Sequence, residues 1–222
     1  MENLKERIGQ CNRCGKNRFW HFPTCEGVSG FFGDEECVFV CSQPHEGDFD
    51  PSAIRLDKRF YENIRKYGFG RAHLTDVVKC RGEKYKELEL WQVRNCNVWL
   101  KEEIQIVKPK AIVAVGRKSF EELEKMNLFI PILKINHYSD YFISDEVYEK
   151  QFKALRDRLG SEKFRQETDE RDQFREFITA INKLKADGKI SNEQWHEYGR
   201  EWRESPHNRV ILMQRLTSLL RD

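Results

Sequence analysis

Short apolar segments alternate with longer amphipathic segments along the first two thirds of this chain. Four apolar segments have the length of buried strands and end at polar or glycine-containing turns: residues 36–42, 73–78, 110–115 and 131–135. Apolar residues recur at helical spacing in three segments between them: residues 56–67, 88–107 and 119–126. Strands that alternate with helices form parallel sheets covered on both faces. The pattern therefore predicts a three-layer α/β/α fold around a four-stranded, mainly parallel sheet.

The character of the sequence changes after about residue 145. Four highly charged segments with helical periodicity follow: residues 146–159, 162–186, 192–204 and 209–220. The last segment is amphipathic, and we expect its apolar side to pack on the preceding domain, with packing on a partner as the alternative. The chain is thus expected to contain an α/β domain over residues 1–145 and a charged helical extension over residues 146–222.

Composition limits the classes of function only weakly. The chain has 39 Lys and Arg residues against 37 Asp and Glu, a net charge of +2, so a nucleic-acid surface would depend on local clusters of basic residues. No window approaches 18 consecutive apolar residues, and the N-terminal segment lacks the apolar core of a signal peptide. We therefore expect a cytoplasmic protein that does not contact membranes, with a monomer as its expected state.

Four of the seven cysteines form the most informative chemical pattern. Cys11 and Cys14 form a C-x2-C pair in a polar, charged segment, and Cys80 and Cys96 lie far along the chain. Four converging thiolates can bind a structural Zn²⁺ ion or a [4Fe–4S] cluster, and the spacing does not decide between them. The alternative is that these cysteines are small buried hydrophobic residues. That reading is favoured for the remaining three, Cys25, Cys37 and Cys41.

Ligands of parallel sheets gather at the carboxyl ends of the strands. Three predicted loops lie at those ends: residues 42–50, 80–81 and 136–141. We therefore expect the functional side chains to lie in these loops.

Several segments together resemble one family, the iron–sulfur (family-4-type) uracil-DNA glycosylases of the uracil-DNA glycosylase superfamily. The similar segments are CNRC at residues 11–14, TDVVKCR at 75–81, Cys96, VKPKAIVAVG at 107–116 and NHYS at 136–139. They occur in the family's order with similar spacing, whereas the C-terminal 80 residues have no counterpart. The resemblance implies a [4Fe–4S] cluster with a structural role, held by Cys11, Cys14, Cys80 and Cys96.

The resemblance also implies the activity of a monofunctional DNA N-glycosylase. Such an enzyme flips a nucleotide out of the stack and hydrolyses the bond between base and sugar. Positive charge develops on the sugar and negative charge on the departing base. The site therefore needs hydrogen-bond donors near the base and an anionic group near the sugar.

The first motif departs from the family pattern. Where the family has Gly-Glu-Ala/Gln-Pro-Gly, this chain has Cys-Ser-Gln-Pro-His at residues 41–45, so Ser42 replaces the carboxylate that positions water. A serine is not a base on its own, and Asp48 is the expected substitute, with solvated loop charges as the alternative reading of the acidic residues at 46, 48 and 50. Gln43 is expected to contact the base. The family's Pro-Phe-Val-Gly segment is missing; Phe49 or Phe60 would supply the stacking ring, although Phe60 fits a core position equally well.

The base-reading position changes as well. The family's Thr-Asn-Val-Val is here Thr-Asp-Val-Val, which places Asp76 where the family has an asparagine. An amide can donate to uracil O4 and accept from N3–H, whereas a carboxylate only accepts. A carboxylate suits the N4 amino group of cytosine. A protonated Asp76 could still bind uracil, but this requires a strongly raised pKa. We therefore expect Asp76 to read a cytosine-type edge.

The late loop supplies the expected catalytic donor. His137 matches the histidine of the family's His-Pro-Ser loop and is expected to donate to O2 of the leaving pyrimidine. Ser139 matches the loop serine and is expected to bind a phosphate, whereas Tyr138 replaces the proline, which predicts a more flexible loop and a further DNA contact. The remaining predicted contacts are Asn136 for the base and Arg81 and Lys79 for the DNA groove, with a solvated surface charge as the alternative for Lys79.

Three functions fit these observations. The leading hypothesis is a DNA glycosylase that excises a modified cytosine, because a missing Pro-Phe-Val-Gly segment leaves room for a bulky base. Bulky cytosine modifications are typical of bacteriophage DNA, so antiviral defence in a prokaryotic or phage-related context is an added hypothesis. The alternatives are a diverged uracil-DNA glycosylase in base-excision repair and a catalytically inactive DNA-binding module.

Overall fold

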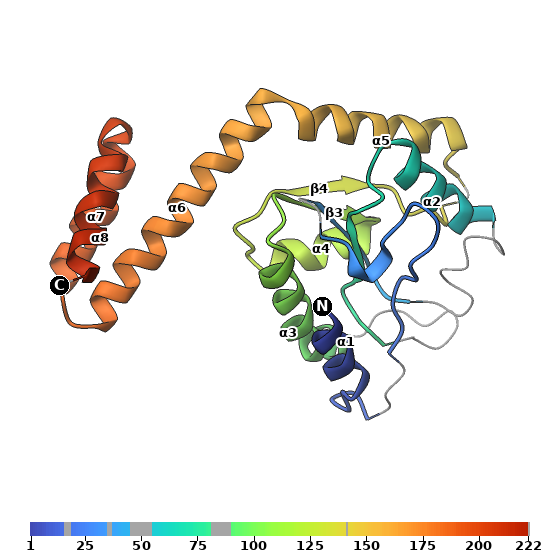
Figure 1. Cartoon of the computed structure of the whole chain (residues 1–222), viewed down its shortest axis with the longest axis horizontal. Coiled ribbons are helices and arrows are strands. Elements are labelled where there is room, and N and C mark those ends of the chain that lie inside the picture. Colours follow the sequence, from blue (N-terminus) through green and yellow to red (C-terminus); the bar gives the residue numbers. More distant parts are fainter. Residues whose placement is uncertain (16–18, 35–36, 45–54, 81–89, 141, 222) are drawn as a thin grey trace. The chain divides into compact units, whose positions relative to one another are not determined.

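The computed structural model describes residues 1–15, 19–34, 37–44, 55–80, 90–140 and 142–221 (Figure 1). The chain divides into two compact units, Met1–Phe164 and Arg165–Asp222. The predicted acidic residue Asp48, the stacking candidate Phe49 and the DNA contact Arg81 lie outside the described residues.

The first unit is built on a parallel sheet of four strands. These are β1 (Cys37–Cys41), β2 (His73–Asp76), β3 (Ala111–Val115) and β4 (Ile132–Ile135), in the order β2-β1-β3-β4. All three neighbouring pairs are parallel, so all four carboxyl ends lie at one edge. Each strand lies within one of the four predicted apolar segments, and the predicted four-stranded sheet is confirmed.

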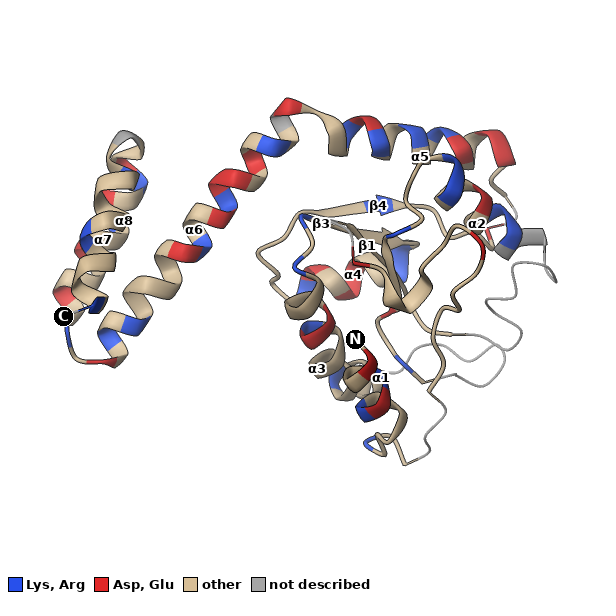
Figure 2. Ribbon diagram, in the orientation of Figure 1, with Lys and Arg blue, Asp and Glu red and all other residues tan. Residues whose placement is uncertain are grey.

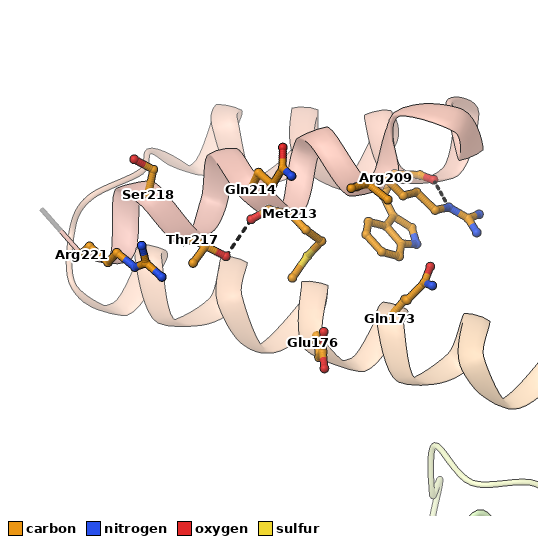
Figure 3. A pocket seen from close by; sticks show the side chains of 10 residues that line it. Gln173, Glu176, Arg209, Met213, Gln214, Thr217, Ser218 and Arg221 are labelled. Carbon is orange, nitrogen blue, oxygen red and sulfur yellow. Dashed lines mark hydrogen bonds between the residues drawn. The ribbon is translucent and has the colours of Figure 1, made fainter.

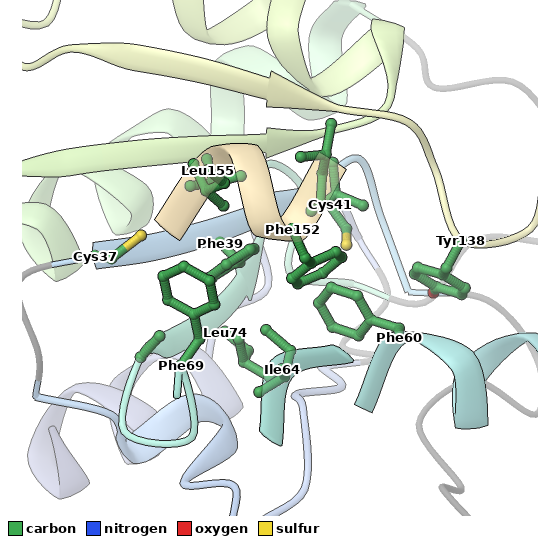
Figure 4. Close-up of a cluster of buried hydrophobic side chains, with 14 of the residues drawn as sticks. Cys37, Phe39, Cys41, Phe60, Ile64, Phe69, Leu74, Tyr138, Phe152 and Leu155 are labelled. Carbon is green, nitrogen blue, oxygen red and sulfur yellow. The ribbon is translucent and has the colours of Figure 1, made fainter. Parts of the chain in front are cut away.

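Successive side chains of each strand point to opposite faces of the sheet, and both faces are buried against helices. Phe39 and Val113 face a cluster that includes residues of α2 (Arg55–Lys66) and α5 (Asp145–Gly160), shown in Figure 4. Val38 and Ile112 face a second cluster with residues of α3 (Leu90–Val107) and α4 (Arg117–Lys125). The predicted three-layer arrangement of helices around the sheet is therefore confirmed.

Helix α5 belongs to the core of the first unit. Its residues Tyr148, Phe152 and Leu155 are buried in the cluster of Phe39, and the Phe152 ring stacks on Phe39 with 5.9 Å between ring centroids. The compact unit accordingly extends to Phe164, beyond the residue 145 at which the change of composition placed the boundary. Charged residues make up half of α5 and most of them are exposed, whereas only a few apolar residues pack on the sheet. The composition therefore made α5 resemble the charged helices that follow it.

A short N-terminal helix, α1 (Glu2–Gly9), was not predicted. Its buried residues Leu4 and Ile8 are four positions apart and pack with Phe31 and Trp99. Phe31 lies in the short 3-10 helix η1 (Gly30–Phe32). Two apolar residues at helical spacing are too few to mark a helix in the sequence.

The second unit is a helical bundle with its own core. It contains most of α6 (Glu162–Ala186), followed by α7 (Asn192–Glu204), η2 (Pro206–Asn208) and α8 (Arg209–Arg221). Phe177 and Trp202 stack at 4.4 Å between centroids, and Leu212 and Leu216 of α8 join the same cluster. The amphipathic α8 thus packs within the helical unit. Along the ribbon of α6, Lys and Arg are interspersed with Asp and Glu, with other residues between them (Figure 2).

A cavity of about 540 Å³ lies within this bundle, between α6 and α8 (Figure 3). Trp202, Arg209 and Met213 are among its lining residues, and the Arg209 Nε donates to the Trp202 carbonyl oxygen.

Among the described residues, no helix is long and apolar enough to cross a membrane.

Candidate active site

The first-motif loop and the base-reading position lie side by side at the carboxyl edge of the sheet. Cys41, the last residue of β1, is in register with Asp76, the last residue of β2. Two backbone bonds extend this pairing: Val77 N–H donates to the Cys41 oxygen at 2.9 Å, and Val78 N–H donates to the Ser42 oxygen at 3.1 Å. The sequence predicted that both loops lie at the carboxyl edge of the sheet, and the register shows that Cys41 and Asp76 are direct neighbours there.

Asp76 is buried, with 2% of its surface exposed. It alternates with Thr75 along β2, so its side chain lies on the face of Leu74, which belongs to the cluster of Phe39. Gln43 is also buried and Ser42 is half-buried. Burial of a carboxylate costs free energy, and buried ionisable side chains at the strand ends of a parallel sheet are candidates for a functional site.

His137 follows β4 at the same edge, and its ring nitrogens are distinguished by hydrogen bonds. The backbone N–H of Ser139 donates to His137 Nδ1 at 3.2 Å, and the Ser139 Oγ lies 2.7 Å from the same nitrogen. A backbone N–H cannot accept, so Nδ1 carries a lone pair and the proton of the neutral ring is on Nε2. The loop therefore presents His137 as an Nε2–H donor.

Gly116 makes room for this histidine. It follows β3 with φ of +94°, and its N–H donates to the Ile135 oxygen at 2.8 Å. A Cβ at this position would lie 3.1 Å from His137 Cβ. A side chain here would be both strained and crowded, so the last residue of VKPKAIVAVG is a spacer for the His137 loop.

The prediction that Tyr138 contacts DNA is wrong. Its ring is buried in the cluster of Phe39, 5.3 Å from the Phe60 centroid, and its carbonyl oxygen accepts from the Arg59 Nη2. The loop is thus anchored to α2, contrary to the flexibility expected when a tyrosine replaces a proline. Phe60 is 1% exposed and belongs to the same core, which excludes its alternative role in stacking on a base.

The prediction that Lys79 lines the DNA groove is also wrong, and so is the alternative of a solvated charge. Lys79 is 2% exposed, and its Nζ lies 2.8 Å from Glu103 Oε2 on α3. The same ammonium donates to Thr75 Oγ1 at 2.7 Å and to the Asp76 carbonyl oxygen at 2.5 Å. The buried carboxylate of Glu103 attracts the lysine inward.

Glu103 and Arg59 are the residues of this region that sequence reasoning missed. Burial raises the pKa of Glu103, but the charge of Lys79 and the hydrogen bond from His73 outweigh it and hold that pKa below its ordinary value. One pattern does point to Glu103: it lies on the apolar side of α3, three and four positions after Leu100 and Trp99. No comparable pattern marks Arg59.

Two further predicted contacts lie at the same edge. Ser139 is exposed, and its Oγ is bound to His137, so its phosphate contact stays a prediction. Asn136 is half-buried, and its backbone N–H donates to Gln151 Oε1 at 2.7 Å.

Several contacts connect the predicted metal ligands Cys14, Cys80 and Cys96 to their surroundings. Phe19 pairs with Cys80 in an antiparallel bridge, and Trp20 N–H donates to the Lys79 oxygen, so the N-terminal segment is tied to this loop. Asn95 Nδ2 donates to Cys14 Sγ at 3.7 Å.

Cys96 interacts electrostatically with two of the other predicted ligands. Burial, with smaller contributions from Cys80 and Cys14, raises the pKa of Cys96 to about 11. Cys11, at the end of α1, is half-buried. Within the described segments, no group of three or more His, Cys, Asp or Glu side chains is arranged to hold a metal ion. Four thiols are a donor set that suits a thiolate-bound centre, and Cys14 and Cys80 both lie close enough to Cys96 to influence its pKa.

Comparison with known proteins agrees with this geometry. Residues 36–185 match the family model of the uracil DNA glycosylase superfamily, so the match includes most of α6, which the resemblance had left without a counterpart. The chain is 28% identical over 125 residues to a type-4 uracil-DNA glycosylase of Sulfurisphaera tokodaii, covering 54% of this chain and 56% of the relative.

Two other relatives are similar over shorter shares or at lower identity. A type-4 uracil-DNA glycosylase of Saccharolobus solfataricus is 25% identical over 135 residues, covering 58% of this chain and 62% of the relative. A type-5 uracil-DNA glycosylase of Pyrobaculum aerophilum is 35% identical over 54 residues, 24% of each chain. The chain thus spans about three fifths of the type-4 relatives. Because the family model matches more than half of its residues, this chain belongs to the uracil DNA glycosylase superfamily.

Proposed function

We propose that this protein is a DNA glycosylase that flips a modified cytosine out of DNA and hydrolyses its N-glycosidic bond. The observation that carries the proposal is the pair of bonds from Ser139 to His137 Nδ1, which leaves the ring proton on Nε2. As the glycosidic bond breaks, negative charge grows on the departing base, and O2 of the cytosine carries part of it. A fixed Nε2–H donor stabilises that charge more in the transition state than in the substrate.

The target edge follows from Asp76. A buried carboxylate accepts hydrogen bonds, and the N4 amino group of cytosine donates them, whereas uracil presents the oxygen O4 at the same place. The anchored backbone of Asp76 supports this role, because Lys79 Nζ fixes its carbonyl oxygen. A modified cytosine and a role in defence against bacteriophage DNA extend the proposal, and the missing Pro-Phe-Val-Gly segment motivates them.

The sugar side of the reaction needs an anion and a positioned water. Ser42 occupies the position of the family's carboxylate next to the Cys41–Asp76 register pair. It can orient a water molecule but cannot take its proton alone. We assign the acidic role to Asp48, which follows six residues later in the sequence.

The cysteine site completes the proposal. Cys11, Cys14, Cys80 and Cys96 would hold a [4Fe–4S] cluster, with Zn²⁺ as the alternative, and the bound group would cross-link the N-terminal segment to the loop after β2. The role is structural. DNA is the partner, and we propose a cytoplasmic monomer.

A second function is a uracil-DNA glycosylase with a diverged first motif, favoured by the names of the type-4 relatives. A third is an inactive DNA-binding module, favoured by the replacement of the motif-one carboxylate with Ser42. Single-turnover excision from duplexes that carry uracil, cytosine or cytosines with bulky substituents separates the three. Excision of a modified cytosine alone agrees with the proposal; excision of uracil alone, or of no base despite binding, supports the second or third function.

A further inference from the structure

We propose that Arg59 is a positioning residue that sets the hydrogen-bonding direction of His137 through one peptide group. The inference rests on the proposed function of His137 as a donor to the leaving base. It assigns to α2 a role in the chemistry that neither the family match nor the sequence indicates.

Arg59 contacts the segment that joins β4 to α5, and its side chain is 7% exposed. Its Nη1 donates to the Ile143 oxygen at 2.9 Å and to Asp145 Oδ1 at 3.1 Å, and its Nη2 donates to the Tyr138 oxygen at 2.5 Å. Its Cζ lies 4.4 Å from the centroid of the Tyr148 ring on α5. One planar fork therefore fixes both ends of the loop.

The contact with Tyr138 matters most, because its carbonyl group and the N–H of Ser139 belong to the same peptide plane. A trans peptide directs these two groups to opposite sides of the chain. Arg59 holds the carbonyl oxygen, and the N–H on the other side donates to His137 Nδ1 at 3.2 Å. Fixing one end of the peptide therefore fixes the direction of the other, and with it the tautomer of His137.

The Tyr138 ring adds a second constraint. It stacks on the His137 ring with 4.3 Å between centroids and an interplanar angle of 28°. On α2, Phe60 lies next to Arg59 and packs against the same Tyr138 ring at 5.3 Å. Helix α2 thus holds the backbone of Tyr138 through Arg59 and its ring through Phe60. This chain obtains from these contacts the rigidity that a proline would otherwise supply to the loop.

The test compares Arg59→Met and Arg59→Lys with a matched control, Arg65→Met. Arg65 lies on the same helix and also donates to a carbonyl oxygen, that of Glu26, but it is exposed. A lysine keeps the charge but cannot reproduce the fork. Tyr138→Phe and Tyr138→Leu test the ring, because the phenylalanine keeps the stacking surface and the leucine removes it.

Two readouts separate positioning from folding. Nitrogen-15 NMR of the histidine rings reports the tautomer of His137 in the full chain without any substrate, and single-turnover excision reports the chemistry. We expect a single Nε2–H tautomer in the wild type, in Arg65→Met and in Tyr138→Phe. Arg59→Met, Arg59→Lys and Tyr138→Leu should populate a second tautomer, and Arg59→Met should lose about 10²-fold in excision rate, a typical cost of misplacing a catalytic group.

An unchanged His137 tautomer in folded Arg59→Met would overturn the inference, whatever its rate. If that variant does not fold, Arg59→Lys decides by the same readout, because it retains the charge but not the fork. If the wild type excises no base, the proposed function fails, but the NMR comparison still decides whether Arg59 sets the tautomer of His137.

Discussion

Lys79 Nζ lies 2.8 Å from Glu103 Oε2, and both side chains are buried beside β2. The same carboxylate oxygen accepts from Thr75 Oγ1 at 2.7 Å. Lys79 precedes the predicted metal ligand Cys80, and its ammonium donates to the carbonyl oxygen of Asp76. The ion pair therefore connects the cysteine site to the residue that we expect to read the base.

Glu103→Gln should destabilise the protein strongly. The substitution leaves the ammonium of Lys79 buried without its counter-charge, and removing one partner of a buried pair costs about 3–5 kcal/mol. Urea unfolding measures the loss, with the exposed Glu124→Gln on α4 as the matched control. A loss no larger than that of the control would contradict a stabilising role for the pair.

The stability of the protein should fall in acid partly because of Glu103. Its pKa is lower in the folded protein than in the unfolded chain, owing to Lys79 and His73. The stabilisation is therefore complete above the unfolded-state pKa and is lost as the pH falls through the folded-state pKa. Urea unfolding at a series of pH values should show a flatter acid limb for Glu103→Gln than for the wild type. Identical acid limbs would exclude this contribution.

The strands could be predicted because each is a continuous apolar run with turn residues at its ends, as in β3. The burial of Lys79 could not be predicted, because lysine is almost never fully buried and its partner Glu103 comes from a helix 24 residues later. The only indication in the sequence was Glu103 itself, a charged residue on the apolar side of α3 that would need a buried partner of opposite charge.

The candidate site was predictable at the level of loops and less so at the level of side chains. The sequence placed Asp76 and His137 at the carboxyl edge of the sheet because parallel strands end together. The role of Tyr138 depends on Phe60 and Arg59, which are distant in sequence and meet it only through the packing of α2. The orientation of the peptide group between Tyr138 and Ser139 cannot be predicted from residue types or their spacing, because contacts with α2 determine it.

Asp76→Asn should shift the base preference from a cytosine edge towards uracil. The amide supplies a donor for uracil O4 that the carboxylate lacks. A well-placed pair of contacts discriminates between bases by about 1–3 kcal/mol, roughly tenfold to more than a hundredfold. Single-turnover excision from the duplex panel measures the shift, with the exposed Asp187→Asn as control. The same base profile in the variant and the wild type would mean that Asp76 does not read the base.

The purified protein should be brown, with broad visible absorbance from thiolate-bound iron. Iron and zinc content measured on the same sample decide between the two ions, and a colourless protein with one zinc per chain would replace iron with zinc at the same site. Cys96→Ser should remove the metal and lower the thermal midpoint, because the bound group ties the N-terminal segment to the loop after β2. Cys25→Ser is the matched control and should retain both metal and midpoint.

His137→Ala should abolish most turnover while DNA binding survives. The Nε2–H donor acts on charge that develops as the base departs, and removal of one such donor typically costs about 10²–10³ in rate. Affinity depends mainly on phosphate contacts made by other residues, so it should change little. Single-turnover excision and a binding measurement on the same duplex separate these effects, with the exposed His196→Ala as control. Full excision by His137→Ala would remove this residue from the mechanism. A joint loss of binding and of the folded state would show instead that its packing on Gly116 and Tyr138 is what the site requires.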